Sequence, residues 1–286
     1  MLIRVKRTLA RVFHKTKTSL ENSLFYVMRS FLRCLPTRTL ANLKSFLTPI
    51  TQLDYQEHTI LMHADSELHL YRARACAKEP ETVRWIEESF QPGDVFYDIG
   101  ANVGAYSLVA SKHCGGYLTV HAFEPSFSTY DQLCRNIILN HCEESIIPHM
   151  IALAAESAPV IFNYSSLESG SALHALSESS SPPKQFAPVY RQHSLGFSLD
   201  DLVSQFGFPV PHHIKLDVDG TELDILHGAT HILGQNFVKT ILVEVGTENR
   251  QADAVTEFLY NKNFYLWSKT DRGDGNTWNY IFKCQT

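Results

Sequence analysis

A short glycine-containing segment carries the strongest chemical signal in the sequence. It reads Phe96-Tyr97-Asp98-Ile99-Gly100-Ala101-Asn102-Val103-Gly104, an apolar strand that runs into a tight loop and opens a helix. Gly100 lets the backbone approach a ligand, and Gly104 lets the helix pack closely. The loop amides and the helix N-terminus predict a positive cradle for an anionic group. Asp98 adds a negative charge suited to an ammonium group.

A second acidic position closes the next predicted strand. Glu124 ends the stretch Val120–Glu124 and stands 20 residues beyond Gly104. An acidic residue at about this distance from such a loop accepts hydrogen bonds from ribose hydroxyls. A strand-end glutamate on its own is more often a solvated surface residue, but the loop and the acid together predict a nucleoside-containing cofactor.

Nicotinamide cofactors need the same two features and are the main competing interpretation. Their fingerprint is G-x-G-x-x-G, whose second glycine admits the pyrophosphate. Here Asn102 occupies that position, and the loop holds only two glycines. A pyrophosphate would have less room and would lie unfavourably near Asp98. The loop therefore favours a methyl donor, whose methionine carboxylate and ammonium match the two charges, over NAD.

A third motif, Ile214–Glu222, places two charged residues at the end of a predicted central strand. Asp217 lies at the carboxyl edge, where open α/β sheets bind ligands. Lys215 and Asp217 flank Leu216, so they share a face of the strand. Two interpretations stay open: a pair in an active site, or an ion pair that holds strand to helix. Glu222 equally fits a helix-start charge favoured by the helix dipole.

Alternating strand and helix patterns surround these motifs. Predicted strands are Val95–Asp98, Leu118–Phe123, Ile146–Leu153, Val160–Tyr164, Ile214–Val218 and Thr240–Val245, and predicted helices are Glu79–Phe90, Gly104–His113, Ser126–Asn140 and Gln251–Asn261. A hairpin is expected over Phe264–Ser268 and Trp278–Lys283, and short strands and turns over 51–78. This order predicts an α/β fold with a mainly parallel sheet, helices on both faces and an antiparallel edge hairpin.

Composition limits the remaining choices. The chain has 286 residues, of which 44% are hydrophobic and 19% charged, as expected of a globular protein. Its six cysteines form neither a C-x-x-C pair nor a zinc-site spacing, so no metal site is predicted. Scattered free thiols indicate a reducing compartment, and a cytoplasmic location is expected.

The first 50 residues differ from the rest in charge. They hold ten lysines and arginines and one acid, a net charge of +9, against −14 for the remainder. Apolar residues at helical spacing from Leu20 to Leu35 predict an amphipathic helix that ends before Pro36. Two roles fit: packing on the catalytic domain, or peripheral contact with the inner face of a membrane. No run of about 20 apolar residues predicts a spanning helix.

These patterns predict two parts, a basic N-terminal extension over 1–78 and a catalytic domain over 79–286. The Ser/Pro-rich stretch 165–188 interrupts the strand–helix rhythm. A loop this long inside a compact domain often acts as a lid, and a disordered spacer is the alternative.

The assembled motifs resemble the FkbM family of S-adenosylmethionine-dependent methyltransferases. The matching pieces, in the family's order, are Asp98–Gly104, Phe123–Pro125, Ala152-Leu153, Ser198–Leu202, Ile214–Glu222, Leu226–Ala229 and Ile241–Val245. The resemblance implies a Rossmann-like class I methyltransferase fold with a seven-stranded sheet, preceded here by a helical extension. Asp219 replaces the family's usual Glu, and Ala154-Ala155 stand where a small residue and an acid are common.

The resemblance also implies the activity and its residues. The expected reaction is O-methylation of a hydroxyl on a sugar, glycan or related metabolite, with no nucleic-acid partner. The expected cofactor residues are Asp98, Gly100, Ala101, Asn102, Gly104, Glu124, Leu153 and Asp217. Asp217 is the first choice for general base and Glu244 is a further candidate, whereas Lys215 would lower the pKa of the acceptor hydroxyl or orient it. A magnesium site on Asp217 and Glu244 lacks supporting ligand spacing, and a non-catalytic cofactor-binding scaffold is the other class kept open.

Overall fold

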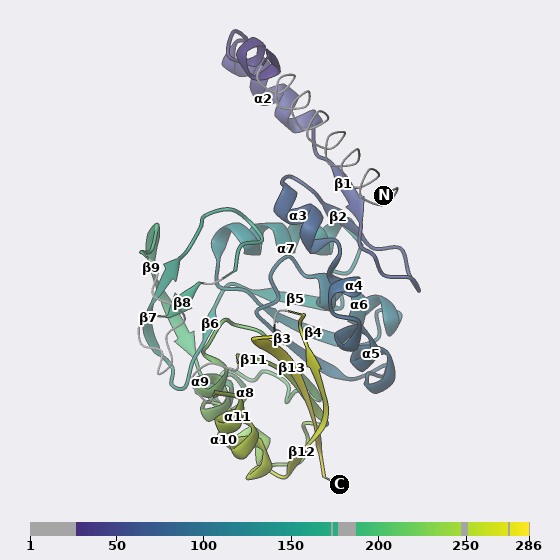
Figure 1. The fold of residues 1–286 in the computed structure, drawn as a ribbon, viewed down its shortest axis with the longest axis vertical. Coiled ribbons are helices and arrows are strands. Elements are labelled where there is room, and N and C mark those ends of the chain that lie inside the picture. Colours follow the sequence, from purple (N-terminus) through teal and green to yellow (C-terminus); the bar gives the residue numbers. More distant parts are fainter. Residues whose placement is uncertain (1–26, 173, 177–186, 247–250, 274, 286) are drawn as a thin grey trace, which may run out of the picture. The chain divides into compact units, whose positions relative to one another are not determined.

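The computed structural model describes residues 27–172, 174–176, 187–246, 251–273 and 275–285. The chain divides into two compact units, Met1–Pro49 and Ile50–Thr286 (Figure 1). In the first unit residues 27–32 are helical and residues 33–35 turn, so this part of the predicted helix ends three residues early. Leu20 and Leu24 lie outside the described residues. A further helix, α2 (Thr37–Phe46), was not predicted and begins directly after Pro36.

The second unit is built on a seven-stranded sheet in the order β12-β13-β11-β10-β3-β4-β5. Its strands are β3 (Val95–Ile99), β4 (Thr119–Phe123), β5 (Ile146–His149), β10 (His213–Leu216), β11 (Thr240–Gly246), β12 (Phe264–Asp271) and β13 (Thr277–Cys284). Neighbours from β5 to β11 pair parallel, whereas β13 pairs antiparallel with both β11 and β12. The predicted mainly parallel sheet with an antiparallel edge hairpin is confirmed.

Helices cover both faces of this sheet (Figure 1). One face carries α5 (Pro80–Ser89), α6 (Ala105–His113) and α7 (Phe127–Leu139), and the other carries α8 (Leu199–Ser204), α9 (Glu222–His227), α10 (Thr230–Leu233) and α11 (Gln251–Tyr260). Successive strand residues alternate between the two cores, since Phe96 packs in one and Tyr97 in the other. The helices packed on both faces hold in place the strand ends at which the sequence motifs lie.

A second, four-stranded sheet in the order β6-β9-β7-β8 is inserted after β5. It consists of β6 (Ala152–Leu153), β7 (Ala158–Tyr164), β8 (Ala175–Leu176) and β9 (Tyr190–Phe197). The single strand predicted over Ile146–Leu153 is therefore wrong, because its first half pairs with β4 and its last two residues pair with β9. An apolar run does not reveal that the chain changes sheets.

Residues 50–78 form β1 (Ile50–Gln52), β2 (Leu61–His63), α3 (Glu67–Arg72) and α4 (Ala75–Lys78). The two strands agree with the prediction, but the helices replace expected turns, and Ser66 caps α3 by accepting a hydrogen bond from the His69 amide. Leu53 and Ile60 are buried in the core of the second unit. The structural boundary therefore follows Pro49 rather than residue 78. Within the described residues, no helix is long and apolar enough to cross a membrane.

Candidate active site

A pocket opens at the carboxyl ends of β3, β4, β10 and β11, where the strand order reverses between β3 and β10. In open α/β sheets this crevice is where ligands bind. Its polar walls come from elements that are distant in sequence, namely α3 and α4, the glycine loop, the ends of four strands and the β12–β13 hairpin. The charged lining residues are Arg72, Lys78, Glu79, Glu124, Lys215, Asp217, Asp219, Glu244 and Arg272.

The glycine loop forms the floor of this pocket. Gly100 has a φ of 78°, and a Cβ placed there would lie 1.9 Å from the Asp217 carbonyl oxygen. Gly104 has a φ of 88°, and its Cβ would lie 2.6 Å from a Leu133 methyl group. Each position thus needs glycine for its backbone conformation and for close packing. Gly100, Ala101 and Asn102 line the pocket, whereas Gly104 is the N-cap residue of α6.

The amides of this loop are already used inside the protein. Gly100 and Ala101 both donate to the Phe123 carbonyl, and Gly104 donates to the Ala101 carbonyl. Asn102 donates to Glu124 Oε2 at 3.0 Å, and its own side-chain oxygen accepts from the Val103 amide. These five amides are therefore not free to bind a carboxylate, which leaves the helix N-terminus as the other part of the predicted cradle. The first turn of α6 retains amides without helical partners.

Glu124 lies at the end of β4 with its carboxylate held in place. Besides the Asn102 amide, the Ser126 amide donates to its Oε1 at 2.9 Å. Each oxygen keeps a second lone pair, so the carboxylate retains acceptor capacity for hydroxyl groups. Burial raises the pKa of Glu124 to about 7, against the opposing effect of these two amides. The residue is 6% exposed and lines the pocket.

Lys215 sits between two carboxylates. Its Nζ lies 2.8 Å from Asp217 Oδ2 and 3.9 Å from Asp98 Oδ1, and the side chain is almost fully buried. Burial opposes ionisation of Asp217, but the charge and hydrogen bond of Lys215, together with the charges of Arg272 and Arg72, outweigh it and lower the pKa of Asp217. The shared strand face of Lys215 and Asp217 is confirmed by this contact. The ion pair stays within the β10 edge, so it does not hold strand to helix.

Asp98 is placed beneath the loop rather than in the pocket. Its Oδ2 accepts a 2.5 Å hydrogen bond from Ser107, and only 1% of the residue is exposed. Burial raises its pKa despite Lys215. In this position Asp98 lies 3.9 Å from Lys215 and does not line the pocket, so its predicted direct contact with an ammonium group is not supported by the geometry.

Glu222 shapes the turn that presents Asp217. It is the first residue of α9, as predicted for a helix-start charge. Its Oε1 accepts from the Gly220 amide at 3.0 Å and from the Val218 amide at 3.4 Å, and its Oε2 accepts from Gln251. This buried carboxylate ties the loop after β10 to α11.

An ion-pair network missed at the sequence level lies opposite Asp217. Arg272 of the β12–β13 hairpin contacts Glu79 Oε1 at 2.6 Å and also Glu244 Oε2. Burial and the nearby Asp217 raise the pKa of Glu244 to about 8. Glu79 precedes α5 and is 4% exposed. No local pattern in the sequence connects Glu79 to Arg272.

Most of the uncharged residues that line the pocket are apolar. Phe123, Ile151, Ala152 and Leu153 line it, as do Ser171, Ala172, His174 and Leu176 from the segment between β7 and the end of β8. Asn102 Nδ2 donates to the Ser171 carbonyl at 3.0 Å, which ties that segment to the loop. Part of the stretch 165–188 is thus a pocket wall. Residues 177–186 lie outside the described residues, and lid movement stays a prediction.

The structure brings the predicted catalytic residues together. Lys215, Asp217 and Glu244 all line one pocket, which Glu124 and Leu153 also line. Among the residues that the structure describes, no group of three or more His, Cys, Asp and Glu is arranged to hold a metal ion. Asp217 and Glu244 each contact a cation, which gives the magnesium alternative no support.

Fold and site together define the class of protein. Numbered in chain order, the seven strands lie 3-2-1-4-5-7-6, with a glycine loop after the first and an acid at the end of the second. This is a Rossmann-like class I methyltransferase fold. The chain belongs to the FkbM methyltransferase family, because the Methyltransferase FkbM domain matches residues 98–266, more than half of its length.

The individual relatives and solved structures share low sequence identity with this chain. The hexuronic acid methyltransferase AglP of Haloferax volcanii is 28% identical over 176 residues, which cover 62% of this chain and 66% of AglP, just under two thirds. The FkbM methyltransferase of Methylobacillus flagellatus has a TM-score of 0.48 at 15% identity, over 75% of this chain and 52% of that one. A precorrin-6y C5,15-methyltransferase of Geobacter metallireducens has a TM-score of 0.42 at 15% identity, over 73% and 87%.

Proposed function

We propose that this protein transfers a methyl group from S-adenosylmethionine to a hydroxyl group on a sugar, glycan or related metabolite. The observation that carries the proposal is the joint placement of Glu124 and Asp217, which line one pocket on two sides of the glycine loop. Membership of a methyltransferase family supports the reaction type. The name of the relative AglP, a hexuronic acid methyltransferase, supports a sugar acceptor.

The residues present fit this cofactor. Glu124 retains acceptor capacity for the two ribose hydroxyls, and Ile151, Ala152 and Leu153 offer an apolar surface to the adenine ring. A side chain at Gly100 would collide with the Asp217 carbonyl, so the glycine loop packs closely against the end of β10 and holds Asp217 beside the loop. The tight loop leaves no comparable space for the pyrophosphate of NAD, because Asn102 replaces the second glycine of the dinucleotide fingerprint.

The chain's own residues would position the acceptor and remove its proton. When bound, S-adenosylmethionine supplies a methyl group activated by its sulfonium, so alignment of the acceptor oxygen dominates the barrier. Asp217 is our first choice for the proton acceptor, since its side chain is 27% exposed and Lys215 fixes its orientation. Glu244 is the second candidate, because its raised pKa lies nearer neutrality.

Two measurements test this function separately. Calorimetry should detect binding of S-adenosylmethionine or S-adenosylhomocysteine and none of NAD. Methyl transfer from labelled donor should then be measured on a panel of glycans, uronic acids and small hydroxylated metabolites. Tight NAD binding without donor binding would falsify the cofactor assignment, and donor binding without turnover on any acceptor would favour a non-catalytic role.

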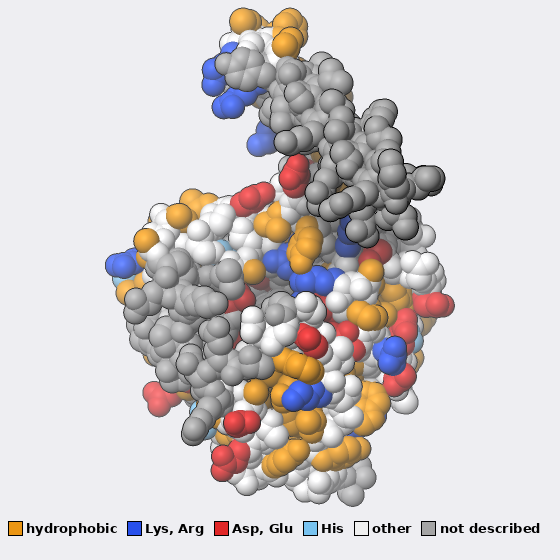
Figure 2. Space-filling view, viewed as in Figure 1, with side chains coloured by type: hydrophobic (Ala, Val, Ile, Leu, Met, Phe, Trp, Pro, Cys, Tyr) orange, Lys and Arg blue, Asp and Glu red, His pale blue; other side chains and the backbone are white. Residues whose placement is uncertain are grey.

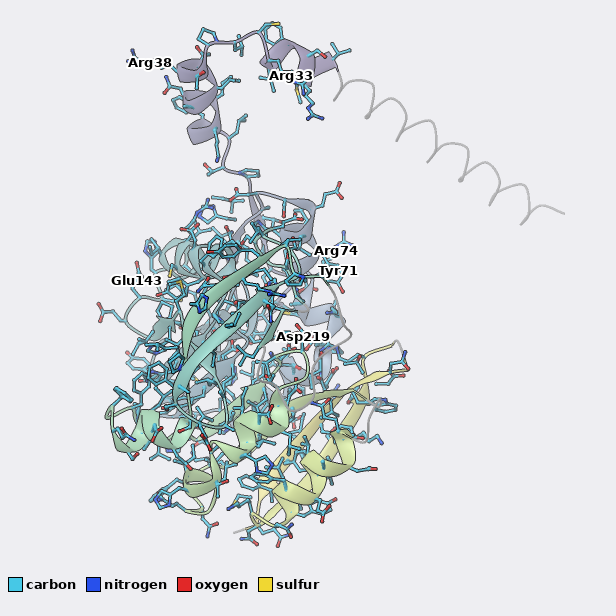
Figure 3. All side chains as sticks on the ribbon, turned by 90° about the vertical axis from the view of Figure 1, so that its left-hand side faces the viewer. Arg33, Arg38, Tyr71, Arg74, Glu143 and Asp219 are labelled. Atoms are coloured by element: carbon cyan, nitrogen blue, oxygen red, sulfur yellow. The ribbon has the colours of Figure 1, made fainter. Side chains whose placement is uncertain are left out.

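A second proposal concerns residues 1–50, which we propose attach the protein to an anionic membrane surface. In the described part of this unit Val27, Phe31, Phe46 and Leu47 are between 65% and 84% exposed. Basic and apolar side chains lie next to one another on it (Figure 2), and Arg33 and Arg38 project outward (Figure 3). Burial of the apolar side chains among the lipid headgroups would favour membrane binding, and each basic residue near the anionic surface would add roughly 1 kcal/mol of binding free energy.

Co-sedimentation with vesicles distinguishes this role from a structural one. The full chain should pellet with vesicles containing anionic lipid at low salt and be released as salt rises, and it should ignore neutral vesicles. A protein that begins at Thr51 should stay in the supernatant while remaining folded. If the full chain ignores anionic vesicles and the shortened protein aggregates, the segment is structural and the membrane proposal is wrong.

A further inference from the structure

The carboxylate of the methyl donor needs a partner that the glycine loop does not supply. Every amide from Gly100 to Gly104 donates to an acceptor within the protein. A carboxylate that leaves water costs free energy unless it is paired and hydrogen-bonded. If S-adenosylmethionine is the cofactor, as proposed above, a cationic side chain in the pocket must take this role, with help from the first-turn amides of α6.

Among the residues that the structure describes, four lysines and arginines line the pocket: Arg72, Lys78, Lys215 and Arg272. Lys215 is paired with Asp217 at 2.8 Å, and Arg272 is paired with Glu79 at 2.6 Å. These two cations balance carboxylates of the protein itself. Lys78 lies 3.8 Å from the same Glu79, so its charge is also directed toward the acidic network.

Arg72 differs from the other three. As the last residue of α3, it donates from Nε and Nη2 to the Gly170 carbonyl at 2.9 and 2.7 Å. That acceptor is neutral, so these bonds hold the guanidinium in place without cancelling its charge. Arg72 is close enough to both Glu124 and Asp217 to favour their ionised forms. Its neighbours Tyr71 and Arg74 are labelled in Figure 3.

We infer that Arg72 binds the carboxylate of the donor's methionine group. A guanidinium has five N–H donors and can contact the Gly170 carbonyl and a carboxylate at once. The position fits, because the Arg72 charge favours the ionised forms of Glu124, proposed for the ribose, and of Asp217, proposed for the methyl end. The donor would lie between these two residues. Arg72 precedes residues 98–266, so this contact is provided by a part of the chain that the family domain does not include.

Ligands that differ only in the carboxylate test this inference. Calorimetry, without acceptor, compares S-adenosylmethionine with decarboxylated S-adenosylmethionine on the full-length protein and on Arg72→Gln. The wild-type protein should prefer the complete donor, and R72Q should lose roughly 10–100-fold in affinity for it while binding the decarboxylated ligand as before. R72K should retain part of the preference. Arg74→Gln is the matched control, since Arg74 is exposed and caps α4 without a side-chain hydrogen bond.

The other outcomes separate the inference from the function it rests on. Equal losses for both ligands in R72Q would mean that Arg72 acts only by anchoring the segment around Gly170, which would overturn the inference. An unchanged preference in R72Q would also overturn it and assign the carboxylate to the first turn of α6. Failure of the wild-type protein to bind either ligand would instead count against the proposed cofactor.

Discussion

The two ends of the pocket hold their carboxylates in different ways. At the end that we propose binds the ribose, called the ribose end below, Glu124 is held by the amides of Asn102 and Ser126, and burial raises its pKa to about 7. At the other end Asp217 is held by Lys215, which lowers its pKa. A carboxylate held by amides can titrate near neutral pH, whereas one held by a buried cation stays ionised. The ribose end is thus built for hydrogen bonding, and the Asp217 end for fixed charge.

The largest effect is expected at Lys215. Lys215→Met would leave Asp98 and Asp217 without their shared cation, and breaking a buried pair typically costs about 3–5 kcal/mol. Chemical denaturation should show this loss in the free energy of unfolding. Arg135→Met is the matched control, because Arg135 pairs with Asp65 at 2.6 Å and the two side chains are 32% and 34% exposed. An exposed pair contributes about 1 kcal/mol or less, so equal losses in the two variants would contradict the comparison.

Asp217→Asn comes next, since it keeps the shape of the side chain and removes its charge. If Asp217 accepts the hydroxyl proton, turnover should fall about 10²–10⁴-fold while donor affinity changes little. Single-turnover rates and donor calorimetry measure the two quantities. Glu244→Gln provides the comparison, because a larger loss there would move the proton acceptor to Glu244. Should donor binding collapse in D217N, Asp217 belongs to the cofactor site and the base lies elsewhere.

The sequence predicted the parts of this site that are local. The Asp98–Gly104 loop, Glu124 and Asp217 each follow a short apolar strand, and carboxyl ends of parallel strands meet at one edge of a sheet. The fold class followed from the same alternation, and it is confirmed by the strand order. These features could be predicted because each depends on a few consecutive residues.

The parts that escaped prediction depend on tertiary placement. Glu79 meets Arg272 only because α5 and the β12–β13 hairpin pack around the same pocket. The loop amides were expected to be free, but the Phe123 carbonyl and Glu124 take three of them once β4 lies beside β3. Strand β9 was not predicted because only one of its eight residues is buried and its sequence shows no apolar run.

At the ribose end, Glu124→Ala should weaken donor binding by about 1.5–3 kcal/mol, the range for hydrogen bonds to charged groups. The fold should survive, because Glu124 ends its strand and contacts only two amides. Calorimetry with S-adenosylhomocysteine measures the change. Glu143→Gln, at an exposed position labelled in Figure 3, should leave affinity unaltered. Wild-type affinity in a folded E124A protein would remove Glu124 from the cofactor site.

The last expected effect is a pH dependence of stability that comes from Glu124 and is spread over several pH units. Burial raises the pKa of Glu124 to about 7 from an ordinary value of 4.5, so the folded protein binds its proton more tightly than the unfolded chain does. Stability from this group is therefore complete below about pH 4.5 and lost as pH rises through about 7, by roughly 1 kcal/mol per pH unit within that window. Asp217 contributes no such loss there, because Lys215 keeps it ionised. Urea unfolding of the donor-free protein between pH 5 and 8 should show a shallower decline in Glu124→Gln than in the wild type. Identical declines would mean that Glu124 is ionised throughout this range, and the contrast between amide-held and cation-held carboxylates would then be wrong.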